Sequence, residues 1–497
     1  MRDQPAALCD ATLPSLSRNN PALTLPDYAR GALTPGIAHI GVGNFHRVHQ
    51  AAYIDRCLHL PGHAGWAISG IGLGDGAGAR AKAEAFRQQD GLYAVTQFAA
   101  DGSSTTRVIG AMVEYLHAPG DPQAVLARLA HPATRIVSLT ITEGGYNIDE
   151  SSGDFMLDTP DVASDLAGHA PRTAFGYIVE ALRQRRAAGL PAFTVLSCDN
   201  LRQNGDTARH AVLSFARARD GALADWIAHH VEFPNSMVDR IAPGVSADDR
   251  QRLASLTGVH DRQPAIGEPY MQWVLEDRFS NGRPDLAAAG VELRSDVHAY
   301  EAMKGRLLNA AHMLLAYPAI LLGYRLVAEA MADPLLHQLL NRFMESDVIP
   351  HLDGPQGVSL YRYKDKVLER FANPAVADQL LRVAHDGAAK IPVFHAQTMD
   401  RLLGTGGNLE RMAFLLACYA SYLGGNDEQG QSFEVKEPRL DAADLALLAG
   451  TDPLALLHTS PFRGMALADD AALCGTYLAM VNAIDGQGVR ATLRMIL

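Results

Sequence analysis

The stretch Ile37-Ala-His-Ile-Gly41-Val-Gly43-Asn44-Phe45-His46-Arg47 decides the fold. An apolar run that enters Gly-x-Gly and continues into a helical pattern is typical of the first βα unit of a dinucleotide-binding domain. Gly41 permits the tight turn, and Gly43 lets the backbone approach a pyrophosphate. The helix that follows directs its N–H groups and its dipole at the phosphate charge. This stretch therefore predicts the phosphate end of a nucleotide site.

The other residues of this turn complete the predicted cofactor site. The third glycine of the fingerprint is missing, because His46 stands at its position. We expect His46 and Arg47 to add positive charge beside the phosphates, with Asn44 and Phe45 as further cofactor-binding residues. Taken alone, the motif also fits an ordinary strand, turn and helix, and the βα units that follow it favour nucleotide binding.

Strand and helix patterns alternate after this turn. Apolar runs typical of buried strands cover 66–73, 92–98, 105–113, 135–142 and 192–198, and helical patterns cover 51–58, 79–89 and 172–188. A hairpin is predicted around Asp101-Gly102. Strands that alternate with helices indicate an α/β domain with a right-handed parallel sheet.

The pattern changes near residue 284, where strand signals become rare. Leu- and Ala-rich helical segments follow at 299–317, 320–331, 334–345, 376–385, 409–422 and 441–448. We therefore predict an α/β protein with a Rossmann-type N-terminal domain and a mainly α-helical C-terminal domain. The first covers 1–285, including an N-terminal extension to about residue 34, and the second, the substrate and catalytic domain, covers 286–497.

Composition excludes several classes of protein. The formal net charge of −12 argues against non-specific nucleic-acid binding, which needs a basic surface. The five cysteines are scattered, as is typical of reduced thiols in a cytoplasmic protein. No signal peptide is evident, and the most apolar stretch, 310–324, is shorter than a membrane span requires. The expected partner is a small molecule, with neither a nucleic acid nor a membrane.

The most informative residues of the C-terminal half are Lys304, Asn309 and His312, in a K-x4-N-x2-H pattern set among Leu, Ala and Met. A desolvated lysine loses its proton easily and is a candidate general base, and a buried Asn amide can stabilise an alkoxide. On an ideal α-helix, Lys304 and His312 lie about 80° apart, and Asn309 about 60° beyond His312. The alternative is a helix end whose lysine extends to water.

Residues at other strand ends extend the predicted site. Asn200 follows the strand at 192–198, and residues 143–147 follow the strand at 135–142. Ligands of parallel sheets gather at such ends, so we expect Asn200 and Asn309 to reach one substrate oxygen, with Lys304 between them. The alternative for Asn200 is a helix cap before residues 201–204.

Asp75 is the candidate for the ribose 2′-OH, because an acidic residue is expected after the second strand. If Asp75 faces the ribose, it selects NAD by repelling a 2′-phosphate, and if it does not, Arg80 favours NADP. Its alternative role is that of a turn aspartate.

For a metal ion, the nearest candidate ligands are His46 and His49. They have no convincing third partner, so we expect no metal site.

Several blocks of the chain carry a family resemblance. They are Gly36–Gln50, Ile136–Tyr146, Phe193–Asn200, Phe233–Arg240 and Gln272–Asp277, together with the K-x4-N-x2-H helix. With these blocks the chain resembles the polyol-specific long-chain dehydrogenases of the mannitol 2-dehydrogenase type. The resemblance covers nearly the whole chain and implies metal-independent, NAD(P)-dependent, reversible oxidation of a polyol of the mannitol, arabinitol or sorbitol class to a ketose such as fructose.

The resemblance also implies roles for individual residues. Lys304 would be the general base, Asn200 and Asn309 the oxyanion donors, and His312 a ligand of substrate hydroxyls. Asp239 matches a family aspartate linked to proton movement and site electrostatics, and Arg382 and Lys390 match residues that line the polyol pocket. The resemblance further implies a monomer.

One departure leaves the cofactor preference open. Members of the family tend to carry an acidic pair after the second strand, where this chain reads Gly74-Asp75-Gly76-Ala77. NAD is expected, and use of both cofactors or of NADP is the alternative. Two other functions also stay open: a sugar-acid reductase of the same family, acting on fructuronate or tagaturonate, and a non-catalytic NAD-binding sensor.

Overall fold

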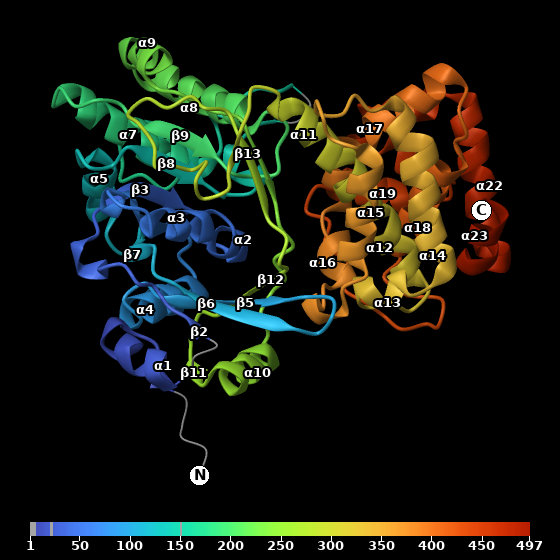
Figure 1. Cartoon of the computed structure of the whole chain (residues 1–497). Helices are drawn as coiled ribbons and strands as arrows, with labels where there is room; N and C mark the ends of the chain where they lie inside the picture. Colours follow the sequence, from blue (N-terminus) through green and yellow to red (C-terminus); the bar gives the residue numbers. More distant parts are fainter. Residues whose placement is uncertain (1–5, 20–22, 150–151) are drawn as a thin grey trace. The chain divides into compact units, whose positions relative to one another are not determined.

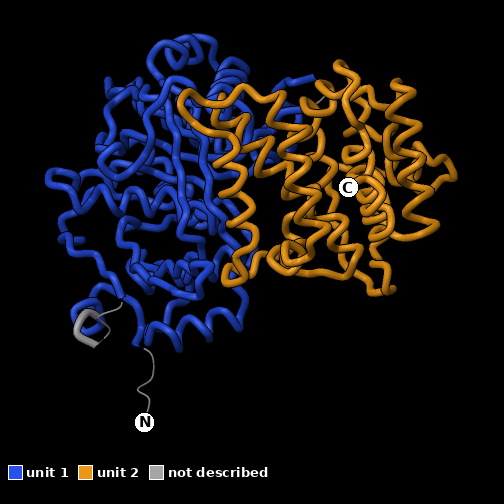
Figure 2. The backbone as a smooth tube through the Cα atoms, turned by 45° about the vertical axis from the view of Figure 1, so that its right-hand side comes forward, with its two compact units in different colours: residues 1–298 blue, residues 299–497 orange. Residues whose placement is uncertain are grey.

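The computed structural model describes residues 6–19, 23–149 and 152–497. The chain divides into two compact units, Met1–His298 and Ala299–Leu497 (Figure 2). The predicted division at 285/286 falls shortly before this boundary.

The main sheet of the first unit has five parallel strands in the order β7-β4-β3-β8-β9 (Figure 1). The central strand is β3 (Pro35–Ile40). On one side lie β4 (Ala67–Gly72) and β7 (Met112–His117), and on the other β8 (Ile136–Leu139) and β9 (Thr194–Ser197). The order reverses at β3, which is where parallel sheets of this kind bind ligands. The predicted Rossmann-type sheet is confirmed.

Successive residues of these strands enter two different hydrophobic clusters. Ile136 packs in a cluster with α3 (Gln50–Leu58), whereas Val137 packs in one with α5 (Pro122–Ala130) and α7 (Ala174–Ala187). This alternation follows from the period of two in a β-strand. Because both faces are covered, the strands read as nearly continuous apolar runs, and that explains why the sequence revealed them.

Smaller sheets flank the main one. The predicted hairpin is formed by β5 (Tyr93–Phe98) and β6 (Ser104–Ile109), in a sheet with order β12-β5-β6-β2. The prediction of one strand over 105–113 is wrong, because the chain leaves β6 at Gly110 and enters the main sheet as β7. A β-carbon at Gly110 would lie 2.7 Å from the Pro26 side chain, so this crossing needs glycine. The other strands are β1 (Ala6–Ala7), β2 (Leu23–Thr24), β10 (Ser236–Asp239), β11 (Val259–His260), β12 (Ala265–Gly267), β13 (Gln272–Leu275) and β14 (Glu292–Leu293).

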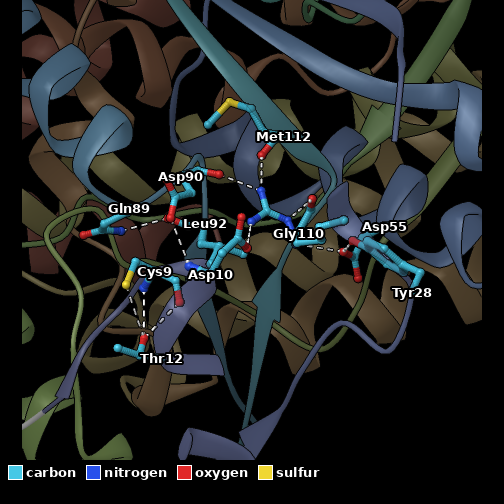
Figure 3. Close-up of polar contacts among 11 residues, drawn as sticks. Cys9, Asp10, Thr12, Tyr28, Asp55, Gln89, Asp90, Leu92, Gly110 and Met112 are labelled. Carbon is cyan, nitrogen blue, oxygen red and sulfur yellow. Dashed lines mark hydrogen bonds and ion pairs between the residues drawn. The ribbon is translucent and has the colours of Figure 1, made fainter. Parts of the chain in front are cut away.

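The segment before β3 is tied to this framework (Figure 3). Arg30 pairs with Asp10 and donates to the Met112 carbonyl at 3.0 Å. The buried Asp55 carboxylate accepts from the Tyr28 hydroxyl at 2.5 Å. These contacts make the N-terminal extension part of the first unit.

The second unit is helical, as predicted, with α12 (Ala310–Leu321) buried along its whole length. The unit also contains α13 (Val327–Met331), α14 (Pro334–Arg342), α15 (Leu360–Phe371), α16 (Leu380–Ala384), α17 (Gly387–Thr405), α18 (Glu410–Tyr422), α19 (Ala442–Leu448), α22 (Ala471–Gln487) and α23 (Val489–Met495). The single helix predicted over 320–331 is wrong, because α12 ends at Leu321 and Gly323 has φ +92°. Among the described residues, none of the helices has the length and apolar character of a membrane span.

Candidate active site

The turn after β3 shows why its two glycines are needed. Gly41 has φ +97°, and a β-carbon there would lie 2.0 Å from the Thr140 carbonyl oxygen. The Thr140 hydroxyl donates to the Gly41 carbonyl at 2.6 Å and fixes the turn against the end of β8. At Gly43 a β-carbon would meet only the Gly41 oxygen, at 3.8 Å, so the backbone there is open to close approach. This geometry fits a pyrophosphate.

A cavity of about 460 Å³ lies at the carboxyl ends of β3, β4 and β8. Its volume is in the range of small-molecule sites. The lining residues come from the Gly41 turn, from the end of β4 and from the segments after β8: Gly41, Leu73, Gly74, Ile141, Gly144, Gly145, Asn147, Thr159, Pro160, Asp161, Thr173 and Ala174. The cavity lies where the strand order reverses, the expected position of a dinucleotide.

His46 differs from the prediction in its charge. Its ring is buried, stacks on His39 with the centroids 3.4 Å apart, and has no hydrogen-bond partner on either nitrogen within the described part of the chain. Burial, and then the neighbouring His39 and Arg47, hold the pKa of His46 well below its usual value. The imidazole is therefore neutral, and the expected positive charge at this position is wrong. Its contact with the cofactor stays a prediction.

The other three predicted cofactor residues of this turn, Asn44, Phe45 and Arg47, make contacts within the first unit. The buried Arg47 guanidinium donates to the Asn44 side-chain oxygen and to the Gln263 carbonyl, the latter at 2.5 Å. Phe45 stacks on His49, with ring centroids 4.9 Å apart. Their side chains thus hold the α2 segment (Asn44–Val48) against neighbouring parts of the unit.

The predicted ribose anchor lies beyond the cavity lining. Asp75 follows Gly74, and its side chain is 80% exposed and forms a 3.2 Å ion pair with Arg80, itself largely exposed. Lys82, on α4 (Ala77–Gln88), donates to the Val42 carbonyl, and burial, followed by the charge of Arg47, lowers its pKa to about 8. The Asp75 carboxylate and the Arg80 guanidinium thus lie side by side after the second strand, β4.

Asn200 lies at the end of β9, as predicted. Its side chain is exposed, and α8 (Asn204–Arg219) begins only after Gln203, which occupies the N-cap. The alternative role of Asn200 as the helix cap is therefore excluded. Asp239 is the last residue of β10, is 2% exposed, and pairs in register with Gln272 of β13.

Lys304, Asn309 and His312 lie in one continuous helical run of the second unit. The run is not an ideal α-helix, because residues Lys304–Asn309 form a π-helical turn between α11 (Val297–Met303) and α12. The Ala310 N–H bonds to the Gly305 carbonyl, the i→i+5 pattern of a π-helix. The predicted angles are therefore wrong: Lys304 and Asn309, five residues apart, lie about one turn apart and on the same side.

His312 follows on α12. Its ring stacks on Phe371 at 4.2 Å, and its Nε2 lies 3.6 Å from the Asp378 carboxylate, too far for a hydrogen bond. This buried nitrogen has no partner within the described residues. Burial lowers the pKa of His312 to about 4, with Arg382 and Lys390 acting in the same direction and Asp378 opposing them. His312 is therefore neutral near pH 7, with a nitrogen available to a ligand.

Arg382 and Lys390 are near His312 in the second unit. Arg382 forms two hydrogen bonds to Asp378, of 2.8 and 2.7 Å, and Lys390 donates to the His385 carbonyl at 2.5 Å. Without the family resemblance, both would pass for surface charges. Asp378 was missed, because no motif marks it and only folding brings it to His312.

In the described part of the chain, no group of three or more His, Cys, Asp and Glu side chains is arranged to hold a metal ion. The His46-x-x-His49 pair has other contacts: His49 Nε2 lies 2.8 Å from the Gln272 carbonyl oxygen, and His46 stacks on His39.

Comparison with known proteins matches both units. The family described as mannitol dehydrogenase Rossmann domain matches residues 35–288, and the mannitol dehydrogenase C-terminal domain matches 296–484. A polyol:NADP oxidoreductase of Gluconobacter oxydans is 47% identical, over 97% of this chain and 99% of its own length. A mannitol 2-dehydrogenase of Phaeosphaeria nodorum is 40% identical over 98% of this chain and 86% of its own.

Two solved structures are similar throughout. A ternary complex of Pseudomonas fluorescens mannitol 2-dehydrogenase with NAD and D-mannitol has a TM-score of 0.92 and 41% identity, covering 99% of both chains. A D-sorbitol dehydrogenase in substrate-free form has a TM-score of 0.86 and 44% identity, covering 98% of this chain and all of the other. The chain therefore belongs to the mannitol dehydrogenase family of NAD(P)-dependent oxidoreductases, as its glycine turn and its lysine helix indicated.

Proposed function

We propose that this protein catalyses the reversible, metal-independent oxidation of a secondary hydroxyl of a mannitol-, arabinitol- or sorbitol-class polyol to a ketose such as fructose. The observation that carries the proposal is the π-helical turn, which presents Lys304 and Asn309 on the same side. A base and an amide donor beside each other suit an alcohol that loses a proton while its oxygen gains charge.

Lys304 takes the hydroxyl proton. The residue is buried, with 7% of its surface exposed, and burial in general disfavours the ammonium form of a lysine. The Asn309 amide donates to the hydroxyl oxygen and stabilises the alkoxide that develops there, and Asn200 is the second proposed oxyanion donor. A bound nicotinamide cofactor would supply the acceptor for the hydride that leaves the carbinol carbon. In the reverse direction, the Lys304 ammonium returns the proton to the new hydroxyl.

The remaining hydroxyls of the substrate bind at His312 and its neighbours. The unpartnered His312 Nε2 is a suitable acceptor or donor for a hydroxyl, and Asp378 and Arg382 are further polar groups near it. A neutral polyol suits this cluster, since Arg382 already forms two hydrogen bonds to Asp378. A uronate would need a cation for its terminal carboxylate, and the charge of Arg382 is already balanced by Asp378. We therefore favour the polyol over fructuronate or tagaturonate.

Asp239, buried at the end of β10, acts through its charge on the site and on proton movement. For the cofactor, we propose that both NAD and NADP bind. Asp75 opposes a 2′-phosphate, whereas Arg80, exposed beside it, attracts one.

A substrate panel with both cofactors tests the proposal. Mannitol, sorbitol and arabinitol are each oxidised with NAD and with NADP, and fructose and fructuronate are each reduced with NADH. We expect turnover with at least one polyol and faster reduction of fructose than of fructuronate. Reduction of fructuronate alone would replace the polyol assignment with the sugar-acid assignment.

A further inference from the structure

We propose that Asp199 is a positioning residue whose carboxylate holds the 141–147 loop in the conformation that forms one side of the dinucleotide cavity. The inference rests on the proposed function only in taking that cavity as the cofactor site. Asp199 directly precedes Asn200 and lies just after β9.

The contacts of Asp199 join two strand ends. One carboxylate oxygen accepts from the Thr142 N–H at 2.9 Å, and the other accepts from the Ile141 N–H at 3.0 Å and from the Tyr146 hydroxyl at 2.8 Å. Its own carbonyl accepts from the Asn204 side chain at 3.0 Å. The loop after β8 is therefore fixed to the end of β9 by one buried side chain.

The backbone of the loop needs such a restraint. Thr142 has φ +62° and ψ 168°, a region that essentially only glycine adopts without strain. A threonine persists there only when surrounding contacts impose the conformation. Because the Thr142 N–H itself bonds to Asp199, this carboxylate acts at the strained residue.

The same loop lines the cavity. Ile141, Gly144, Gly145 and Asn147 all contribute to its lining, together with Gly41. Release of the loop would let Thr142 return to an ordinary conformation and move these residues. Asp199 therefore controls the shape of the cavity without touching the cofactor, and its loss should weaken cofactor binding more than it lowers turnover.

The charge of Asp199 should also make its hold on the loop depend on pH. Burial raises its pKa to about 6, the nearby Glu143 acts in the same direction, and the three hydrogen bonds oppose them. Tyr146 and Cys198 are the other titratable groups beside it, and burial raises the pKa of each well above its usual value. As pH falls through about 6, Asp199 gains a proton, one oxygen becomes a donor, and its hold on the loop weakens.

The test is the affinity of the full-length protein for NADH, measured by fluorescence titration without substrate. We expect D199N to raise the Kd about tenfold, the loss of a charge-assisted hydrogen bond, and to leave kcat at saturating NADH much less affected. In the wild type, Kd should rise as pH falls from 7 to 5, and in D199N this rise should be absent. Since no substrate is present, failure of the polyol assignment or of the Lys304 assignment does not affect the result.

The matched control is D55N. Asp55 is also buried and accepts from a tyrosine hydroxyl and a backbone N–H, those of Tyr28 and Gly110, but it is not among the residues lining the cavity (Figure 3). D55N should lower the melting temperature while the Kd for NADH and its pH dependence stay as in the wild type. This variant separates loss of a buried carboxylate from loss of the loop restraint.

A rescue variant tests the loop directly. Thr142→Gly removes the strain, so the double variant D199N/T142G should recover part of the affinity that D199N loses. Y146F removes the hydroxyl that donates to Asp199 and keeps the carboxylate, so it should raise the Kd for NADH about two- to threefold. If D199N does not fold, the Kd of Y146F is the deciding measurement. The proposal is overturned if D199N or Y146F binds NADH like the wild type, or if T142G gives no recovery.

Discussion

Lys304 and Asn309 are the first and last residues of one π-helical turn. An α-helix would place them about 140° apart, since five residues at about 100° each exceed one turn by that angle. The π turn contains an additional residue, so both side chains lie on the same side of the run that leads into α12. Such π-helical insertions are frequent at functional sites, and this one brings the proposed base and an amide donor together.

Asn309→Ala should lower kcat by roughly 10²- to 10³-fold, the typical cost of removing one oxyanion donor. KM for the polyol should change little, because the amide acts mainly on charge that develops in the transition state. Steady-state kinetics with saturating cofactor measures both constants. A large rise in KM at unchanged kcat would show that Asn309 binds substrate instead.

His312 makes stability depend on pH. Its pKa is about 4 in the folded state and 6.5 in the ordinary imidazole, so the unfolded chain binds more protons between these values. The stability that the neutral His312 ring contributes to the folded state is fully present above pH 6.5 and is lost as pH falls toward 4. His312→Gln should therefore reduce the loss of unfolding free energy over that range, measured by denaturant titration, and the exposed His229→Gln should not.

The Asp75–Arg80 pair should set the balance between NAD and NADP. Arg80→Ala should raise KM for NADP a few-fold and leave KM for NAD nearly unchanged, and Asp75→Ala should lower KM for NADP. The effects are modest because both side chains are largely exposed. Equal changes for both cofactors in both variants would show that the pair does not contact the 2′ position.

Chelation should leave turnover unaffected, because in the proposed mechanism Lys304 and the amides supply the acid–base and charge-stabilising groups. The measurement is activity after prolonged dialysis against a chelator, with and without added zinc. Loss of activity that zinc restores would contradict the metal-independent assignment.

The sequence predicts the first unit well because buried parallel strands leave continuous apolar runs, and because Gly41 occupies a position that no other residue fits. It predicts less where structure depends on distant contacts. At Gly110 a β-carbon would meet Pro26, a contact between residues far apart in the sequence, and the π turn at Lys304 is not marked by any breaking residue. A residue-by-residue reading therefore assigns a strand and an ideal helix at these places.

The same limit applies to the candidate site. Lys304, Asn200 and Asn309 are marked by unusual residue types in apolar or strand-end positions. Asp378 and Asp199 are ordinary acids in sequence, and their roles emerge only from contacts with His312 and with the loop at Thr142. The charge of His46 was mispredicted because burial, which sets its pKa, is not visible in the motif.

The most direct test is turnover of Lys304→Ala with the preferred polyol, measured beside NADH affinity, with the exposed Lys366→Ala as control. We predict that kcat falls roughly 10²- to 10⁴-fold, that NADH binds as in the wild type, and that added methylamine restores part of the rate. Lys366→Ala should match the wild type. Near-normal turnover by Lys304→Ala would contradict the assignment of this amine as the proton acceptor.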